Sequence, residues 1–273
     1  MSQTLELSII ITSYKNPELL KVAIDSIKKN CQIKDYEIIV ADSATEEKTK
    51  MMMREDYPDI IFIPFKKNTG FQSLVKAAYE KSRGEYILIL NGDIIVTKNS
   101  IENLLRYIKE NTEVGIVGPK LINFNETLQY SCFKFYTPMT IVYRRTFLGK
   151  FGFARKKLDS FLMKDFDHNS IREVDWIMGS ALMTSRRAIS KVGLMDKRFK
   201  MYFEDTDWCR RFWEKGFKVI YFPQSKMYHY HGKGSANKSA LVSLFTNKLA
   251  WIHIASAIKY FLKYFGKKVP THN

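Results

Sequence analysis

Short apolar runs alternate with amphipathic segments along residues 7–117 of the chain. The apolar runs predict five strands, at Leu7–Thr12, Glu37–Ala41, Ile60–Pro64, Tyr86–Leu90 and Val114–Val117. Between them, apolar residues three and four positions apart predict four helices, at Pro17–Asn30, Thr45–Asp56, Phe71–Ser82 and Ser100–Glu110. Strands that alternate with helices are typical of βαβ units. We therefore predict an α/β fold with a mostly parallel central sheet flanked by helices.

The pattern changes in the second half of the chain. From Asn123 to Ile171 an aromatic and basic stretch, including YRRTFLGKFGFARKK, predicts no regular element, and we expect a mobile or substrate-facing segment. Regular patterns return as a strand and short helix in VDWIMGSALMTSRRAISKVG, a helix in FEDTDWCRRFWEKG with acidic residues in its first turn, and a strand in KVIYFP. We divide the chain into a main domain over 1–235, with halves of about 1–122 and 123–235, and a basic region over 236–273.

That C-terminal region has the pattern of an amphipathic helix. From about Ala236 to Phe265 its apolar side chains share one face, which carries Ile254, Ile258, Phe261, Leu262 and Phe265. The helix therefore has an apolar face to bury against protein or lipid.

Charge and cysteine content narrow the function classes. The 273 residues, 45% of them hydrophobic, are enough for a sizeable core, and 44 Lys and Arg against 28 Asp and Glu give a net charge of +16. Such a charge favours polyanionic partners: nucleotide phosphates, nucleic acid or anionic lipid. Cys31, Cys132 and Cys209 are too few and too scattered for a disulfide framework or zinc site, which fits a reducing cytoplasm.

No stretch resembles a signal peptide or reaches the roughly 20 apolar residues needed to span a bilayer. We therefore expect a soluble or peripheral protein.

Polar residues follow several of the predicted strands. In open sheets of this type ligands bind at the carboxyl ends of the strands. Asp93 directly follows the apolar run YILIL, so the sheet would fix its carboxylate while leaving it open to a ligand. Hard oxygen ligands suit Mg²⁺ or Mn²⁺. An ordinary turn at Asn91-Gly92-Asp93 is an equal alternative from the residues alone.

A longer set of motifs occurs in order from Leu7 to Ser235. It comprises SIIITSYKNPELLKVAIDSI, IIVADSATE, NTGFQSLVKAAYEKSRGEYILILNGD, MGSALMTSRRAISKVGLMDKRFKMYFEDTDWCRRFWEKGFKVIYFP and HYHGKGS. Together these resemble glycosyltransferase family 2, inverting enzymes with a Rossmann-like GT-A fold, and within it the rhamnosyltransferase-like branch. The resemblance implies transfer of a sugar such as rhamnose from a dTDP or UDP donor to a hydroxyl of a growing, lipid-linked cell-surface glycan.

The resemblance also implies donor-binding residues. The loop that flanks the nucleotide corresponds to Thr12, Ser13 and Tyr14. Asp42 resembles the carboxylate that reads the pyrimidine edge, with a helix N-cap as the alternative. Asn68 and Gly70 resemble an NxG element beside the donor, with a helix-entry turn as the alternative.

Asn91, Gly92 and Asp93 take the place of the family's DxD metal motif, whose first acid is here an amide. By resemblance Asp93 binds a divalent Mn²⁺ or Mg²⁺, and Asn91 contacts the ribose or a metal ligand. In HYHGKGS, Lys233 and one histidine are expected to return to the diphosphate. Alternate strand residues face opposite sides, so only one histidine reaches the site, and we favour His231 over His229 as a metal ligand.

The acceptor side is expected around FEDTD. Inversion requires a group that removes the acceptor proton, and the family position favours Asp205 as this base. Glu204 is expected to bind the acceptor, while Glu204 or Asp207 alternatively pairs with Arg210 or Arg211 along the helix.

Trp176 and Gly179 resemble the floor beneath the acceptor and donor sugar. A core tryptophan and a turn glycine are the alternatives.

The tail helix and YRRTFLGKFGFARKK both interleave basic and aromatic residues, as interfacial membrane segments do. We expect peripheral binding at the cytoplasmic face of the cell membrane. The alternative is that the tail packs on the catalytic domain or on another subunit of a homodimer.

Three other functions compete with this interpretation. A sugar-phosphate nucleotidyltransferase would begin with a Gly-rich loop instead of SIIITSYKN. A nucleic-acid-binding protein would carry a helix-turn-helix, RNP-like strand or zinc knuckle, and none is apparent, so nucleic acid is not an expected partner. The third is a transferase that binds its donor without turnover, because Asn91 stands where the metal motif has its first acid.

Overall fold

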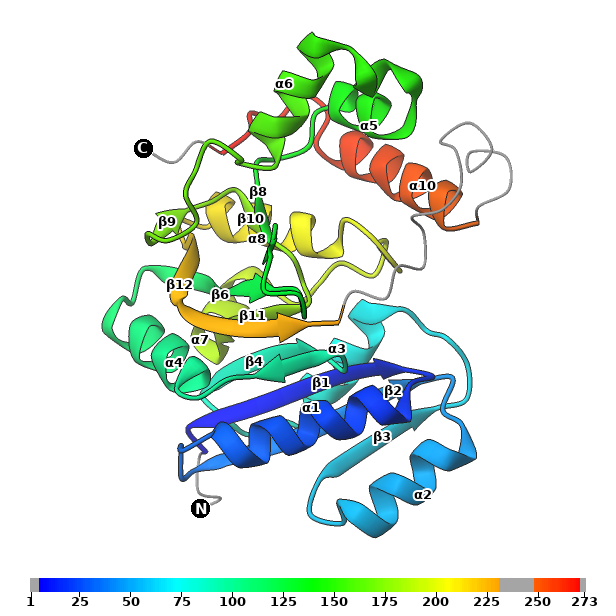
Figure 1. The fold of residues 1–273 in the computed structure, drawn as a ribbon, viewed down its shortest axis with the longest axis vertical. Coiled ribbons are helices and arrows are strands. Elements are labelled where there is room, and N and C mark those ends of the chain that lie inside the picture. The colour runs from blue at the N-terminus through cyan, green and yellow to red at the C-terminus, as the bar shows by residue number, and fades with distance from the viewer. Residues whose placement is uncertain (1–4, 231–247, 271–273) are drawn as a thin grey trace.

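The computed structural model describes residues 5–230 and 248–270. Its centre is a ten-stranded sheet with the main order β3-β2-β1-β4-β11-β6-β12-β5 (Figure 1). The first four strands in this order pair in parallel: β1 (Leu7–Tyr14), β2 (Tyr36–Ser43), β3 (Ile61–Phe65) and β4 (Tyr86–Asn91). The helices between them and after them are α1 (Pro17–Asn30), α2 (Glu47–Asp56), α3 (Phe71–Lys81) and α4 (Ser100–Glu110). The predicted α/β pattern of this half is confirmed, with α1 and α4 at the predicted bounds.

The other half of the sheet is mixed and contains antiparallel as well as parallel pairs. β11 (Ala181–Ser185) is antiparallel to both β4 and β6 (Val114–Ile122), and β5 (Ile94–Val96) is antiparallel to β12 (Lys218–His229). Only β6 and β12 pair in parallel. The remaining elements are α7 (Arg186–Val192), α8 (Glu204–Glu214), edge strands β7 (Leu128–Gln129) and β9 (Arg172–Glu173), and a two-stranded sheet of β8 (Cys132–Phe133) and β10 (Trp176–Ile177).

Both faces of the sheet are buried, because helices cover each one. On β1, Ile9 and Ile11 face the layer that holds α1 and α4, while Ile10 faces α3. Alternate side chains of a strand point to opposite faces. An apolar run without alternation therefore predicts a strand in the middle of such a three-layer structure.

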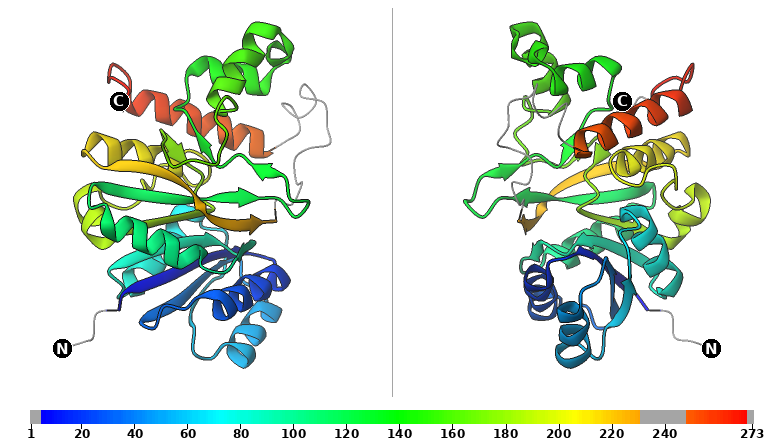
Figure 2. Two further views of the ribbon diagram at one scale, coloured as in Figure 1. Left: turned by 60° about the vertical axis from the view of Figure 1, so that its left-hand side comes forward. Right: turned by 90° about the vertical axis from the view of Figure 1, so that its right-hand side faces the viewer.

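The region from Asn123 to Ile171 contains helices, contrary to the prediction. They are α5 (Pro138–Arg145), the 3₁₀-helix η1 (Phe147–Lys150) and α6 (Gly152–Phe161). Thr137 caps α5 in a capping box with Thr140, and Pro138 occupies the first turn. Such a pair of signals at TPMT marks a helix start. Figures 1 and 2 show α5 and α6 together with α10 (Lys248–Lys263) at one end of the molecule, far from β3.

The C-terminal helix α10 packs on the main domain through a narrow polar and aromatic face. Its buried side chains are Ala250, His253, Ser256, Ala257 and Tyr260. Asp207 of α8, fully buried, accepts hydrogen bonds from Lys263 Nζ at 2.5 Å and Tyr264 Oη at 2.8 Å. The predicted helical segment before residue 248 lies outside the described residues.

No helix in the described ranges is both long and apolar enough to cross a membrane.

Candidate active site

A cavity of about 530 Å³ opens where the loops after β1, β2 and β4 meet the loops before α3 and α8. Eight residues expected from sequence to bind the donor line it: Thr12, Ser13, Tyr14, Asn68, Gly70, Asn91, Gly92 and Asp93. These residues come from three separate stretches of the chain. The sheet topology brings them to one rim, as expected for the carboxyl ends of parallel strands.

Hydrogen bonds fix the tips of β1 and β4 against each other. Thr12 Oγ1 donates to Asn91 Oδ1 at 3.2 Å, and the Gly92 amide donates to the Thr12 carbonyl at 2.8 Å. The Asn91 amide donates to the carbonyl of Ser180, next to β11, at 2.8 Å. The loop that presents Asp93 is therefore held from two sides.

Gly70 joins this rim to the segment before α8. Its φ is +86°, and a Cβ there would lie 2.4 Å from the Lys200 carbonyl oxygen. Only glycine accepts both the left-handed backbone and the close approach. Asn68 Oδ1 accepts a hydrogen bond from the Gly70 amide at 3.0 Å, so the loop is also closed locally.

Asp42 is a fully buried carboxylate beside the cavity wall. It pairs in register with Ser13 and precedes Ser43, and both serines line the cavity. Neither carboxylate oxygen receives a hydrogen bond of ordinary geometry from the described residues. Burial raises the pKa of Asp42, although the Ser13 and Thr45 hydroxyls favour its charged form.

The alternative role of Asp42, a cap for α2, does not fit, because that helix begins at Glu47. A buried acceptor without a partner is instead suited to receive an N–H from a ligand.

Asp93 lies against a histidine from the last long strand. Asp93 Oδ1 is 3.3 Å from His229 Nε2, and His229 Nδ1 is 2.8 Å from Gln129 Oε1. A neutral His229 that donates from Nδ1 to the Gln129 oxygen would present the Nε2 lone pair on the side of Asp93. This arrangement suits a cation held by both groups.

His229 is thus the histidine that contacts Asp93 in the described part of the chain. His231 and Lys233 both lie outside the described residues, so their roles stay predictions. Within residues 5–230 and 248–270, no three His, Cys, Asp or Glu side chains converge on one point. A cation here would need water or ligand oxygens to complete its coordination.

Two adjacent carboxylates at the start of α8 lie behind Gly179. Asp205 Oδ2 accepts a hydrogen bond from the Gly179 amide at 3.0 Å, and Oδ1 accepts one from the Thr206 amide at 2.7 Å. A Cβ on Gly179 would lie 3.4 Å from Asp205 Cβ and 3.2 Å from Cε1 of Phe71, a residue of the cavity wall. Gly179 thus lies between Asp205 and Phe71 in the wall of the cavity.

Burial perturbs both of these acids. It raises the pKa of Asp205 and raises the pKa of Glu204 well above its usual range, where the Asp205 charge adds to the effect. Glu204 Oε2 is buried and has no hydrogen-bond partner among the described residues. Glu204 and Asp205 are therefore more basic than exposed carboxylates, and they lie close to the cavity.

The sequence profile of Glycosyl transferase family 2 matches residues 8–169, more than half of the chain. The chain belongs to this family. This assignment favours glycosyl transfer over the nucleotidyltransferase and nucleic-acid-binding alternatives.

Relatives of this glycosyltransferase point to the rhamnosyltransferase-like branch. It is 26% identical to Rhamnosyltransferase WbbL of Escherichia coli K12, over 92% of this chain and 91% of that protein. It is 24% identical to the N-acetylglucosaminyl-diphospho-decaprenol L-rhamnosyltransferase of Mycobacterium tuberculosis H37Rv, over 80% of this chain and 74% of that protein.

The crystal structure of GalNAc-T7 with UDP, GalNAc and Mn²⁺ is similar in fold. Its TM-score is 0.63 at 16% identity, and the match covers 88% of this chain and 46% of that one. At this identity the likeness shows the GT-A fold alone.

Two residues singled out in the sequence of this glycosyltransferase serve its packing. The Trp176 ring is 6% exposed, lies 4.4 Å from Phe133 and 5.5 Å from Tyr136 between ring centroids, and its Nε1 donates to the Lys134 carbonyl. These contacts leave little surface for a sugar, so the core alternative describes Trp176 better. The Asp207 carboxylate forms ion pairs with Arg211 and Lys263. The pair with Arg211 is the one that the sequence offered as the alternative role of Asp207.

Sequence reasoning missed several cavity residues, namely Asn16, Leu19, Phe71, Leu74, Met201 and Leu249. Asn16 had a readable signal, because it caps α1 directly before Pro17. Met201 and Leu249 had none, since packing between distant segments brings them to the cavity.

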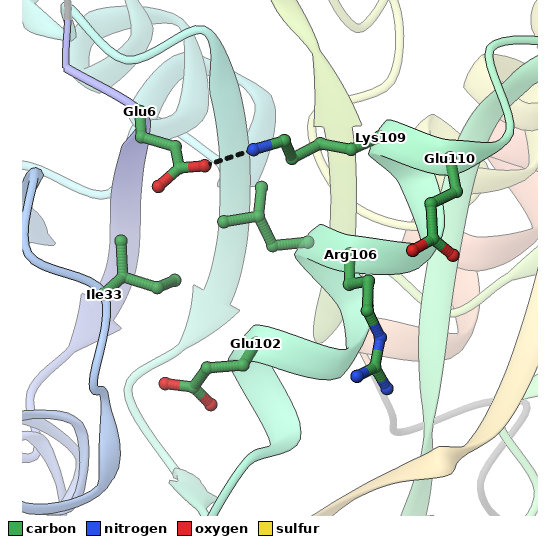
Figure 3. Close-up of a pocket in the computed structure, with 7 residues that line it drawn as sticks. Glu6, Ile33, Glu102, Arg106, Lys109 and Glu110 are labelled. Atoms are coloured by element: carbon green, nitrogen blue, oxygen red, sulfur yellow. Dashed lines mark hydrogen bonds and ion pairs between the residues drawn. The ribbon is translucent and has the colours of Figure 1, made fainter.

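A second cavity, of about 340 Å³, lies between α4 and the start of β1. Figure 3 shows its charged side chains, with the Glu6 carboxylate paired to the Lys109 ammonium at 2.6 Å. Glu102 Oε1 accepts a hydrogen bond from the Gln32 amide at 2.6 Å. Glu6 precedes β1, so this cavity is at the opposite end of the strands from Asp93. Its acids serve local contacts, and it is not the candidate active site.

Proposed function

We propose that this glycosyltransferase is an inverting, metal-dependent enzyme that transfers a deoxyhexose such as rhamnose from a dTDP or UDP donor. The acceptor would be a hydroxyl on a growing, lipid-linked cell-surface glycan. The observation that carries the proposal is the cavity at the tips of β1 and β4, whose wall residue Phe71 lies next to Gly179 and, behind it, Asp205.

The donor nucleotide would lie along the loop after β1. Asp42 supplies a buried acceptor for the ring N–H of uracil or thymine, and both bases offer that donor group. Asn68 and Gly70 would border the donor sugar and diphosphate, with Lys233 as a further predicted phosphate contact.

Asp93 and His229 are the described residues that fit a divalent cation. One carboxylate and one imidazole suit Mn²⁺ or Mg²⁺ when water and substrate phosphates supply the other ligands. When bound, the cation would supply positive charge to the leaving diphosphate, where charge develops most during the reaction.

Asp205 would accept the proton of the attacking acceptor hydroxyl. The Gly179 and Thr206 amides hold its carboxylate in one orientation. Its raised pKa brings its basicity closer to neutral pH, where a general base is most effective. Glu204 and Gly179 would border the acceptor on the same side.

The name of one relative supports the proposed acceptor. The name of the mycobacterial relative describes an acceptor sugar on a lipid diphosphate. By likeness, we propose a lipid-carried acceptor here, reached from the cytoplasmic side by a peripheral enzyme.

A thermal-shift panel of UDP-, dTDP- and GDP-sugars, with and without Mn²⁺, tests the proposal. A ligand at about 100 times its Kd stabilises the native state by about 2.7 kcal/mol. We expect a UDP- or dTDP-sugar to stabilise the enzyme more strongly with Mn²⁺ than without it.

The Asp93→Asn variant is the matched control, because it should lose the Mn²⁺-dependent part of the shift and keep the rest. If no nucleotide sugar stabilises the wild type under any condition, the proposed function is wrong.

A further inference from the structure

The helices α5, η1, α6 and α10 form one end of the molecule (Figures 1 and 2), here called the aromatic end, and exposed apolar side chains gather there. Eleven of the seventeen exposed large hydrophobic side chains among the described residues lie in 139–153 and 249–269. The most exposed are Phe153 at 62%, Leu262 at 71% and Phe265 at 87%. Such a concentration is unusual for a surface that contacts only water.

The aromatic end is also strongly cationic. Residues 138–161 and 249–270 contain ten Lys and Arg and a single acid, Asp159, which pairs with Lys164. In the described part of the chain, only Lys263 among these ten forms an ion pair with a carboxylate. Arg144 instead donates to the Tyr136 hydroxyl at 2.6 Å. The positive charge of this end is therefore largely uncompensated.

Helix α10 has an inner side that packs on the protein and an outer side that exposes apolar residues. Its inner side packs through Tyr260 and through the bonds of Asp207 to Lys263 and Tyr264. Its outer side presents Trp251, Ile258, Leu262 and Phe265, which recur at three-, four- and seven-residue spacing. The inner contacts fix the helix on the domain, so the outer apolar stripe is not needed to hold it there.

We infer that the aromatic end docks on the surface of an anionic lipid bilayer. Aromatic and aliphatic side chains enter the boundary between headgroups and acyl chains, while Lys and Arg attract anionic lipids. A second copy of this chain fits less well, because its uncompensated cations would face the uncompensated cations of the first copy. A nucleic acid would match the charge and leave Leu262 and Phe265 in water.

Docking at this end would place the active site beside the membrane. Leu249, at the start of α10, lines the donor cavity, and α8 begins with the Glu204 and Asp205 carboxylates. Because α8 and α10 are joined through Asp207, the docking surface and the acceptor side belong to one packed unit. A role of this surface in bringing the active site to its acceptor rests on the proposed lipid-carried acceptor. Docking on a bilayer does not depend on that proposal.

The test is sedimentation of the full chain with vesicles, without substrates. We expect binding to vesicles of phosphatidylcholine mixed with phosphatidylglycerol, and much weaker binding to phosphatidylcholine alone. The Phe153→Ser, Leu262→Ser, Phe265→Ser triple variant should partition about tenfold or more less well, since it removes three apolar side chains from the boundary. These side chains are exposed, so the variant should keep its thermal stability.

The matched control replaces exposed apolar residues at the other end of the molecule. Val22→Ser with Met51→Ser, on α1 and α2, should bind vesicles as the wild type does. Docking is refuted if the triple variant binds like the wild type or if the wild type ignores anionic vesicles. A wild-type dimer that the triple variant converts to monomer would also refute it, in favour of self-association.

Nucleotide-sugar thermal shifts on the same preparations separate this inference from the proposed function. A chain that binds a nucleotide sugar and no vesicles refutes docking alone. A chain that binds vesicles and no nucleotide sugar refutes the proposed function alone.

Discussion

The donor rim and the aromatic end are stabilised in different ways. At the donor rim, neighbouring strand tips exchange hydrogen bonds, such as Thr12 to Asn91 and Gly92 to Thr12. At the aromatic end, separate helices meet through aromatic contacts and one buried carboxylate, Asp207. The first region has its geometry set by sheet register, and the second by a few side-chain contacts between helices. A substitution at the rim should therefore affect chemistry, and one at Asp207 should affect folding.

The largest expected effect is on chemistry. Asp205→Asn keeps an acceptor for the Gly179 amide and loses the proton-accepting carboxylate. We expect turnover to fall by about 10²- to 10⁴-fold, the range for loss of a general base. Single-turnover kinetics with donor and acceptor measures it, and donor affinity should be unchanged. Near-normal turnover would show that another group is the base.

The next effect is on stability. Asp207→Asn leaves Arg211 and Lys263 facing a neutral group inside the structure. Removing one partner of a buried ion pair costs about 3–5 kcal/mol. Urea denaturation should show this loss.

Asp59→Asn is the matched control, because the Asp59 pair with Lys28 at 3.0 Å is exposed. It should cost at most about 1 kcal/mol. Equal losses for the two variants would mean that Asp207 is not the point that joins α8 and α10.

A smaller effect is expected on metal affinity. Gln129→Leu removes the acceptor that orients His229 through Nδ1. Loss of such an outer contact weakens metal binding by about 10- to 100-fold. Titration of the donor-dependent thermal shift with Mn²⁺ measures it. An unchanged Mn²⁺ requirement would exclude His229 as a ligand.

The pH dependence should move in a defined direction. The base works deprotonated, and burial raises the pKa of Asp205, so kcat/KM should rise with pH through a midpoint above the usual aspartate range. Glu204→Gln should leave this midpoint nearly in place, because the negative charge of Asp205 raises the pKa of Glu204, so Glu204 is still neutral while Asp205 titrates. The same raised pKa values make the native state more stable at acidic pH, and this stability is lost as pH rises through them. A midpoint that moves strongly in Glu204→Gln would argue against this order of proton loss.

The smallest expected effect concerns Trp176. Trp176→Phe should cost about 1–3 kcal/mol of stability through imperfect packing. Because the ring is buried against Phe133 and Tyr136, the acceptor KM should change little. Steady-state kinetics at varied acceptor concentration measures this KM. A large rise would support the predicted role of Trp176 as the floor beneath the sugar.

Sequence patterns predicted the donor half well because its signals are local. The strand tips at Thr12 and Asn91 follow apolar runs, and parallel pairing brings such tips together whatever the exact register. A strand was predicted around β11, but its antiparallel direction was not, because an apolar run does not encode its direction. The helices α5 and α6 were missed although Thr137 and Pro138 mark a helix start, since the exposed aromatics there hide the periodicity.

The contact of Asp93 with His229 joins residues more than a hundred positions apart. The spacing of HYH indicated that one histidine of the two reaches the site, and only packing decides which.

Gly179 and Ser180 are neighbours in the chain, yet the amide of the first binds Asp205 and the carbonyl of the second binds Asn91. The two-residue segment Gly179-Ser180 thus acts as a spacer between Asn91 at the donor rim and Asp205. Under the proposed function, this spacer keeps the predicted metal site and the predicted base at a constant separation.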